Sequence, residues 1–116
     1  MSEWTIPDSK SESNSIWFGL EAIVSCIAPI MTATTTKLQL QASADPMSVW
    51  DADATFYDVT VDGTEVKFSV SASAGVADGL ETLVRQRRVR VKAETDGGVA
   101  VAQSGAKVIS PMSIRT

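Results

Sequence analysis

The 116-residue chain contains no histidine and only one cysteine, and each shortage excludes classes of function. Without histidine there is no Ser-His-Asp triad, no histidine-ligated zinc and no imidazole to act as a general base near neutral pH. The lone thiol of Cys26 cannot form an internal disulfide, and its apolar surroundings (AIVSCIAPI) predict a small buried side chain. The sequence therefore predicts a protein that is not an enzyme and that holds no metal and no cofactor.

Long apolar runs and an excess of positive charge are also missing. The longest apolar run has about 11 to 12 residues, short of the roughly 20 that span a bilayer, and the start MSEWTIPDSK does not resemble a secretory leader. Ten basic against fourteen acidic residues give a net charge of −4, which disfavours general attraction to nucleic acid or anionic lipid. We expect a soluble protein made in a reducing cytoplasm, with neither a nucleic acid nor a membrane as its partner.

What the chain does have is alternation of apolar and polar residues with period 2, which is typical of half-buried strands. This pattern predicts an all-β fold: a single antiparallel β-sandwich of jelly-roll type with seven to eight short strands. Residues 1–15 are expected to form an N-terminal arm or a first edge strand, and residues 16–116 the sandwich. The alternating segments are WTI, SIWFGLEAIVSCIA, KLQLQAS, FYDV, EVKFSVSAS, RRVRVKAE and KVISPMSIR.

Three local features complete the predicted fold. Asp62 and Gly63 form a DG pair that predicts a hairpin turn. Gly19 and Leu20 predict a bend inside the second apolar segment. One short helical turn is predicted near residues 78–85, because leucine and valine recur there at helical spacing.

The segment LVRQRRVRVKAE holds five of the ten basic residues. On a strand, Arg88, Arg90 and Lys92 would project from one face, while Val89 and Val91 point to the core. The segment lacks the interleaved aromatic residues and the recognition helix of a nucleic-acid surface. Its expected partner is carboxylate, either on the Asp-rich loop of this chain or on a neighbouring protein.

That Asp-rich loop, ASADPMSVWDADATFYD, allows several interpretations. Asp51 and Asp53 supply two of the carboxylates that a Ca²⁺ site with six to eight oxygens would use. Asp51, Asp53 and Asp58 could alternatively supply the carboxylate pair of a glycosidase. Trp50 and Tyr57 are suited to stacking on a surface glycan. The favoured interpretation is structural: Trp50 and Phe56 cap one end of the sandwich, and the aspartates keep the loop solvated or meet a basic partner.

The order of segments resembles small β-sandwich proteins encoded among the structural genes of tailed bacteriophages. The resemblance is carried by WTIPDSKSESNSIWFG, TATTTKLQLQASAD, YDVTVDGTEVKFSV and RRVRVKAETDGGVAVAQSGAKVISPMSIR, and it covers nearly the whole chain. The chain departs from the family's pattern at DPMSVWDAD and at AETDGGVAVAQ.

The resemblance implies a head decoration (cement) protein of the virion, which sits on the capsid exterior and stabilises contacts between capsomers. Its partners would be the major capsid protein and further copies of itself in a homotrimer. A tail or neck component and a carbohydrate- or receptor-binding module are the alternatives. The expected interface residues are Trp4, Ile6, Arg85, Arg88, Arg90 and Lys92, and the expected ligand or partner loop contains Trp50, Asp51, Asp53 and Tyr57.

Overall fold

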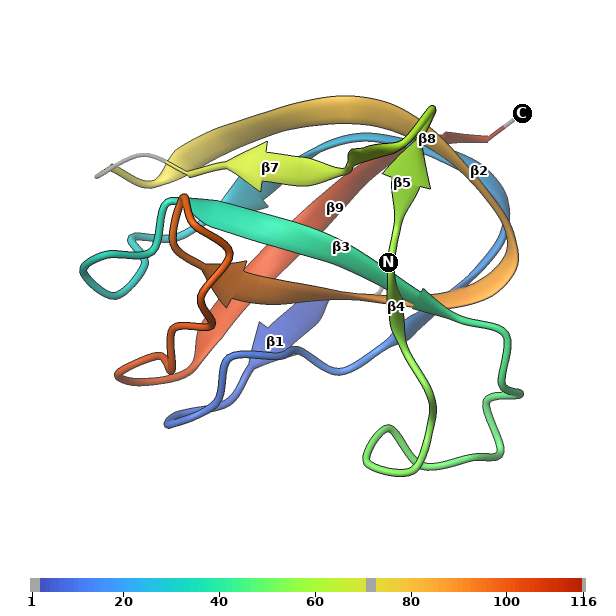
Figure 1. Cartoon of the computed structure of the whole chain (residues 1–116), viewed down its shortest axis with the longest axis horizontal. Coiled ribbons are helices and arrows are strands. Elements are labelled where there is room, and N and C mark those ends of the chain that lie inside the picture. The colour runs from blue at the N-terminus through green and yellow to red at the C-terminus, as the bar shows by residue number, and fades with distance from the viewer. Residues whose placement is uncertain (1–2, 71–72, 116) are drawn as a thin grey trace.

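The computed structural model describes residues 3–70 and 73–115, apart from the side chains of residues 80, 81, 83, 86, 114 and 115. Within these residues the chain is all β and contains no helix (Figure 1). The described residues therefore contain no helix that could cross a membrane. The strands are β1 (Trp4–Ile6), β2 (Ile16–Ala28), β3 (Lys37–Ser43), β4 (Tyr57–Asp58), β5 (Thr60–Val61), β6 (Thr64–Glu65), β7 (Lys67–Ser69), β8 (Gly75–Glu94) and β9 (Lys107–Arg115).

Seven of the strands form one sheet in the order β1-β9-β2-β8-β7-β3-β4, and β5 pairs with β6 in a separate hairpin. The 20-residue strand β8 arcs around the molecule (Figure 1), so that it pairs with β2 on one edge and with both β7 and β3 on the other. The additional β8–β3 pairing closes the sheet into a five-stranded barrel with extra strands. The all-β prediction is confirmed, but one continuous sheet closes on itself where a two-layer jelly roll was expected.

The predicted helical turn near residues 78–85 is wrong, because this segment is part of β8. Its backbone pairs with β2 on both sides of an irregularity between Ile23 and Ser25, where β8 contains three residues opposite the single Val24. These extra residues interrupt the period-2 alternation, so the apolar spacing locally imitates a helix. The side chains of Leu80 and Leu83, on which the helix prediction rested, lie outside the described residues.

Other local predictions have mixed outcomes. The segment KLQLQAS forms β3, and the DG pair makes the β5–β6 turn with Asp62 and Gly63 both at positive φ (52° and 81°). Two such residues in sequence are what a tight hairpin turn requires. No bulge interrupts β2 at Gly19, since the strand runs unbroken through this residue and its register shifts only near Val24.

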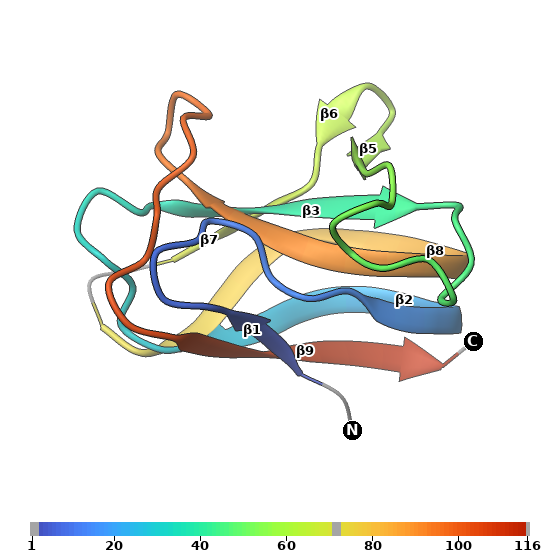
Figure 2. The ribbon, with the colours of Figure 1, turned by 90° about the horizontal axis from the view of Figure 1, so that it is seen from below.

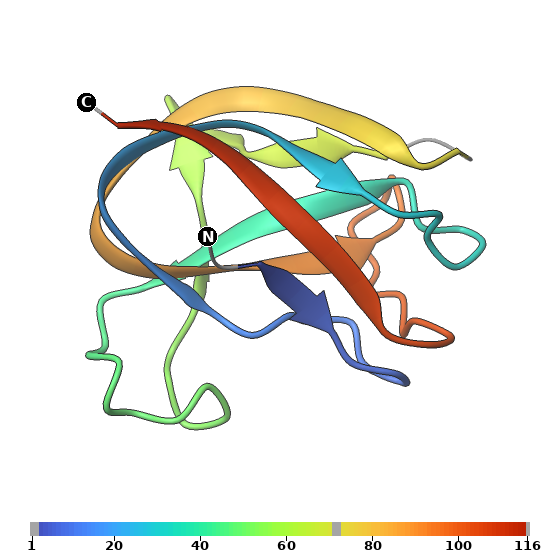
Figure 3. The ribbon, with the colours of Figure 1, turned by 180° about the vertical axis from the view of Figure 1, so that it is seen from behind.

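The N-terminal segment forms an edge strand of the barrel. β1 pairs with β9, where Trp4 lies opposite Ile109, and the two strands run side by side in Figures 2 and 3. Trp4 and Ile6 are fully buried, and the indole Nε1 of Trp4 donates a hydrogen bond to the carbonyl of Val89 at 2.9 Å. The prediction that Trp4 and Ile6 form an interface is therefore not supported, since both side chains belong to the core of their own subunit.

Cys26 is fully buried, as predicted. Burial, with a smaller contribution from the Asp78 carboxylate, raises the pKa of its thiol to about 12. A thiol that stays protonated is a poor nucleophile and a poor metal ligand, which agrees with a purely structural role.

Candidate functional site

Arg88 holds the Asp-rich loop between β3 and β4 against the barrel. Its side chain is only 2% exposed, although it lies on the outward face of β8, because the loop folds over it. The guanidinium donates to the carbonyls of Pro46 (2.8 Å) and Val49 (2.7 Å), to Oδ1 of Asp51 (2.6 Å) and to Oγ of Ser15 (3.1 Å). A planar guanidinium has five donors in a fixed fork, so one side chain is able to fix several loop atoms at once.

Asp51 connects this loop to the start of β2. Besides the ion pair with Arg88, its carboxylate accepts hydrogen bonds from the backbone N–H and the hydroxyl of Ser15. Burial on its own would raise the pKa of Asp51, but the hydrogen bonds from Ser15 and Arg88 outweigh it and hold the pKa below its usual value. The expected pairing of the basic strand with the Asp-rich loop of the same chain is thus confirmed at Arg88 and Asp51.

Phe56, at the C-terminal end of the loop, contacts Arg90 of β8. The guanidinium of Arg90 lies 3.9 Å from the centroid of the Phe56 ring, a cation–π contact, and its Nε donates to Oε1 of Gln41 at 2.9 Å. Gln41 in turn donates to Asp58 at 2.9 Å. Phe56 thus covers the outside of the barrel wall, in part as the sequence predicted.

The exposure of Trp50 contradicts the favoured interpretation, in which it caps the sandwich, and is compatible with its place in the expected ligand or partner loop. Its side chain is 80% exposed, so it does not cap the barrel but projects from the loop. The turn that carries it is ordered by hydrogen bonds from the backbone N–H groups of Asp53 and Ala54 to the Trp50 carbonyl, at 2.9 and 3.0 Å. Asp53 is exposed and forms no ion pair with any side chain that the structure describes. The loop therefore presents a large aromatic side chain to solvent on an anchored backbone.

The expected basic stripe is divided rather than continuous. Lys92 lies 3.6 Å from Glu94, a carboxylate that is only 2% exposed and that also pairs with Lys67. The hydrogen bond that the Lys67 ammonium donates to the Glu94 carboxylate is the main cause of the raised pKa of Lys67. Together with the contacts of Arg88 and Arg90, these pairs leave little of the stripe available to a partner.

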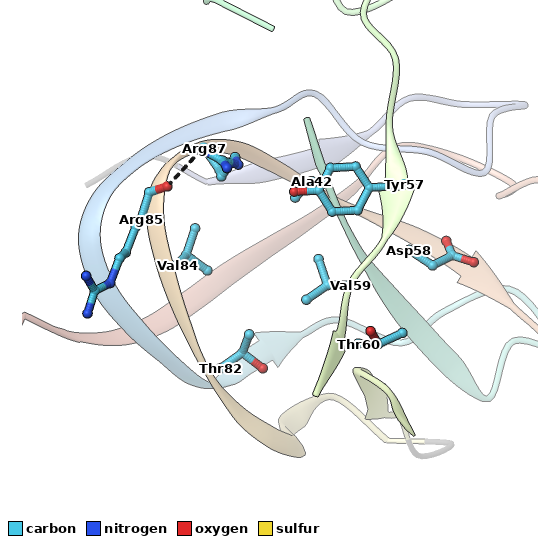
Figure 4. A pocket seen from close by; sticks show the side chains of 9 residues that line it. All are labelled: Ala42, Tyr57, Asp58, Val59, Thr60, Thr82, Val84, Arg85 and Arg87. Carbon is cyan, nitrogen blue, oxygen red and sulfur yellow. Dashed lines mark hydrogen bonds between the residues drawn. The ribbon is translucent and has the colours of Figure 1, made fainter. Parts of the chain in front are cut away.

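Arg85, by contrast, lines a hollow of about 360 Å³ between β8 and the β4–β5 segment (Figure 4). Figure 4 shows Val59 and Val84 pointing toward each other across it, with the ring of Tyr57 beside them and the head of Arg85 directed away. The hollow thus combines an apolar centre with a rim that carries Arg85 on the β8 side and Asp58 on the β4 side. It brings together Arg85 and Tyr57 from the two separate sets of expected site residues. It is also lined by Ala42 and Arg87.

A second hollow, of about 620 Å³, lies between the N-terminal loop and the anchored loop. Lys10, Glu12, Asp51 and Arg90 line it, so its wall carries charges of both signs. No group of three or more metal-ligating side chains occurs among residues 3–70 and 73–115. The calcium interpretation of Asp51 and Asp53 therefore has no supporting cluster, since Asp51 is engaged by Arg88 and Ser15.

Sequence reasoning missed several members of this arrangement. Ser15 and the carbonyls of Pro46 and Val49 carry no sequence signal, because any residue has a carbonyl and serine is common in loops. The burial of Glu94 was also missed, although its position at the end of an alternating strand, opposite Lys37 on β3, placed it on the outward face. Outward-facing residues become buried here because loops cover the barrel wall.

The sequence matches no model of a known protein family, and no curated protein or solved structure is significantly similar to it. The resemblance to phage structural proteins stays a prediction.

Proposed function

We propose that this chain is a non-enzymatic structural protein of a tailed-phage particle, and that it binds its neighbours through the anchored loop that carries Trp50. The observation that carries the proposal is the contrast within this loop. Its backbone is held by a buried arginine, and its largest apolar side chain is 80% exposed. A rigid loop loses little conformational entropy on binding, and tryptophan is among the residues that contribute most to protein interfaces.

The site chemistry supports a binding role over a catalytic one. The buried polar groups of the loop satisfy one another, since Arg88 engages Asp51, Ser15 and two carbonyls. Decoration of the capsid, with the major capsid protein and further copies of this chain in a trimer as partners, is the form of the proposal that the sequence resemblance favours.

The test is the copy number of the protein in purified particles and its dependence on Trp50. We expect Trp50→Ala to weaken binding to the particle by about thirtyfold and to lower its occupancy accordingly, because loss of a central interface tryptophan costs about 2 kcal/mol or more. Occupancy is measured by quantitative mass spectrometry of particles assembled with each variant.

Val99→Ala is the matched control, since Val99 is 65% exposed on a different loop and its truncation should leave occupancy unchanged. Absence of the protein from particles contradicts the proposal, as does an equal loss of occupancy in both variants.

Binding of a surface glycan is the second candidate, favoured by the exposure of two aromatic rings, Trp50 at 80% and Tyr57 at 49%. Exposed aromatic rings stack on the apolar faces of sugars. A glycan array separates the two candidates: retention of a glycan that is lost in Trp50→Ala supports sugar binding, and particle occupancy without any glycan retention supports the structural role.

A further inference from the structure

Strand β8 has a stretch of edge that borders the hollow of Figure 4 instead of a neighbouring strand. On this edge β8 pairs with β7 at Ser69 and Asp78, and with β3 from Ser43 and Arg88 onward. Between these two registers no described strand lies on that side of β8. Exposed strand edges offer backbone donors and acceptors to another extended chain.

The β4–β5 segment forms a second strand edge on the other side of the hollow. β4 pairs with β3 through Tyr57 and Asp58, and Figure 4 shows the β4–β5 segment running along the opposite side of the hollow from β8. The barrel wall therefore has a gap whose two borders are both extended backbone. In most barrels closure removes such edges.

The backbone of Val84 faces this gap. The N–H and C=O of Val91 face Ser13, on the β2 side of β8, and the register between β8 and β2 is continuous from Val89 to Val84, so that even-numbered residues of β8 face the gap. The carbonyl of Arg85 therefore lies on the β2 edge, and it also accepts a hydrogen bond from Nη1 of Arg87 at 3.3 Å, drawn as the dashed line in Figure 4. A backbone N–H of an incoming strand, at the usual distance of about 2.9 Å, would bond to the carbonyl of Val84.

The side chains around the gap favour a particular kind of segment. Val59 and Val84 form an apolar site between the two borders, suited to one apolar side chain of an extended peptide. Arg85 is exposed beside it and forms no ion pair with any described side chain, whereas Arg88 and Lys92 of the same strand are paired with carboxylates of this chain. The positive charge at this rim is complementary to an acidic residue of the peptide.

We propose that the gap between β8 and β4 binds an extended acidic peptide segment of a partner protein by strand addition. The segment hydrogen-bonds to the edge of β8 at Val84, places one apolar side chain between Val59 and Val84, and directs a carboxylate toward Arg85. Strand addition of this kind gives affinity through main-chain bonds and specificity through the pockets for alternate side chains. The inference goes beyond the proposed function, because it holds whether or not the chain belongs to a phage particle.

The probe is a synthetic peptide in which valine and glutamate alternate, labelled with fluorescein and titrated with the whole protein up to about 1 mM, the weak end of specific affinities. We expect saturable binding and slower amide exchange at Val84, measured by NMR. A second peptide of the same sequence, N-methylated at alternate backbone amides, should bind about tenfold more weakly, because it cannot complete the strand pairing.

Variants of the protein separate strand addition from simple charge attraction. Arg85→Glu should weaken binding by about tenfold, while Lys10→Glu, a matched charge reversal at an exposed lysine outside the hollow, should not. Val84→Lys should abolish binding, and its circular dichroism and melting temperature show whether it still folds. If Val84→Lys does not fold, Arg85→Glu still tests the proposal, because Arg85 is exposed.

The proposal is overturned by any of three results: no binding of the alternating peptide, equal binding of the N-methylated peptide, or equal binding of polyglutamate. Each would show that the β8 edge does not pair with an added strand.

Discussion

At the scale of single residues, Arg88 shows how a surface position becomes part of the interior. Its place in the strand alternation is outward, yet the loop of residues 44–56 covers it, leaving 2% of the side chain exposed. A buried guanidinium is stabilising only when its donors are satisfied, and here two carbonyls, Asp51 and Ser15 accept them. The residue therefore orders the loop more than it binds a partner.

Replacing Arg88 should destabilise the protein. We expect Arg88→Met to lower the free energy of unfolding by about 2 to 3 kcal/mol, because it leaves buried carbonyls and the Asp51 carboxylate without donors. Arg85→Met, an exposed arginine on the same strand, should change it by less than about 0.5 kcal/mol. Urea denaturation, monitored by tryptophan fluorescence, measures the change in both variants. An unchanged unfolding midpoint for Arg88→Met would show that Arg88 does not stabilise the loop.

The pH dependence of stability should contain a contribution from Asp51. Its pKa in the folded protein lies below the ordinary value of 3.8, so the stabilisation is fully present above that value and is lost as the pH falls through the lower folded pKa. The stability difference between the wild type and Asp51→Asn should therefore shrink below about pH 4. Urea denaturation at a series of pH values checks this, and a difference that stays constant down to about pH 2 would contradict it.

At the scale of elements, β8 determines the architecture. A single strand of 20 residues reaches from β7 around to β3 while pairing with β2 along its other edge, so the sheet closes without a second layer. Closure needs strong local curvature, and the extra residues of β8 opposite Val24 lie within the curved strand. Bulges of this kind bend and twist the strand that carries them.

Gly79, one of these extra residues, should tolerate no side chain. A Cβ there would lie 2.7 Å from the carbonyl oxygen of Lys67 and 2.9 Å from Cδ1 of Phe68. We expect Gly79→Ala to destabilise the protein by about 2 kcal/mol, the usual cost of overpacking against backbone. At Gly19 nothing lies within 4 Å of an added Cβ, so Gly19→Ala serves as the matched control and should change the melting temperature very little. Equal melting temperatures of the two variants would contradict the close approach of β8 to β7.

At the scale of the whole molecule, the first and last strands pair with each other in the sheet. β1 pairs with β9, and Trp4 fills the core beside Phe18, with ring centroids 6.2 Å apart. The fold is therefore complete only when its first strand is in place. All-β proteins dominated by such distant pairings fold slowly, because the entropy of loop closure is lost before the long-range contacts that offset it can form.

Truncation of Trp4 tests this closure in the isolated protein. We expect Trp4→Ala to lower the free energy of unfolding by about 4 kcal/mol, from the loss of a fully buried indole and of its hydrogen bond to Val89. If the N-terminal segment were an arm ordered only on a neighbour, the isolated protein would be unaffected. Calorimetry of the wild type and the variant distinguishes the two.

The sequence by itself predicted most of the strands and much of the core, but not the first half of β8, where it predicted a helical turn. Alternation placed Leu38, Leu40, Val89 and Val91 inside, and the DG pair located the hairpin, because both signals are local. Only the tertiary structure decided that the sheet closes, that Arg88 is buried, that Trp50 is exposed and that Trp4 belongs to the barrel. These outcomes depend on which distant segments pair and on where loops cover the wall, and period-2 alternation carries no information about either.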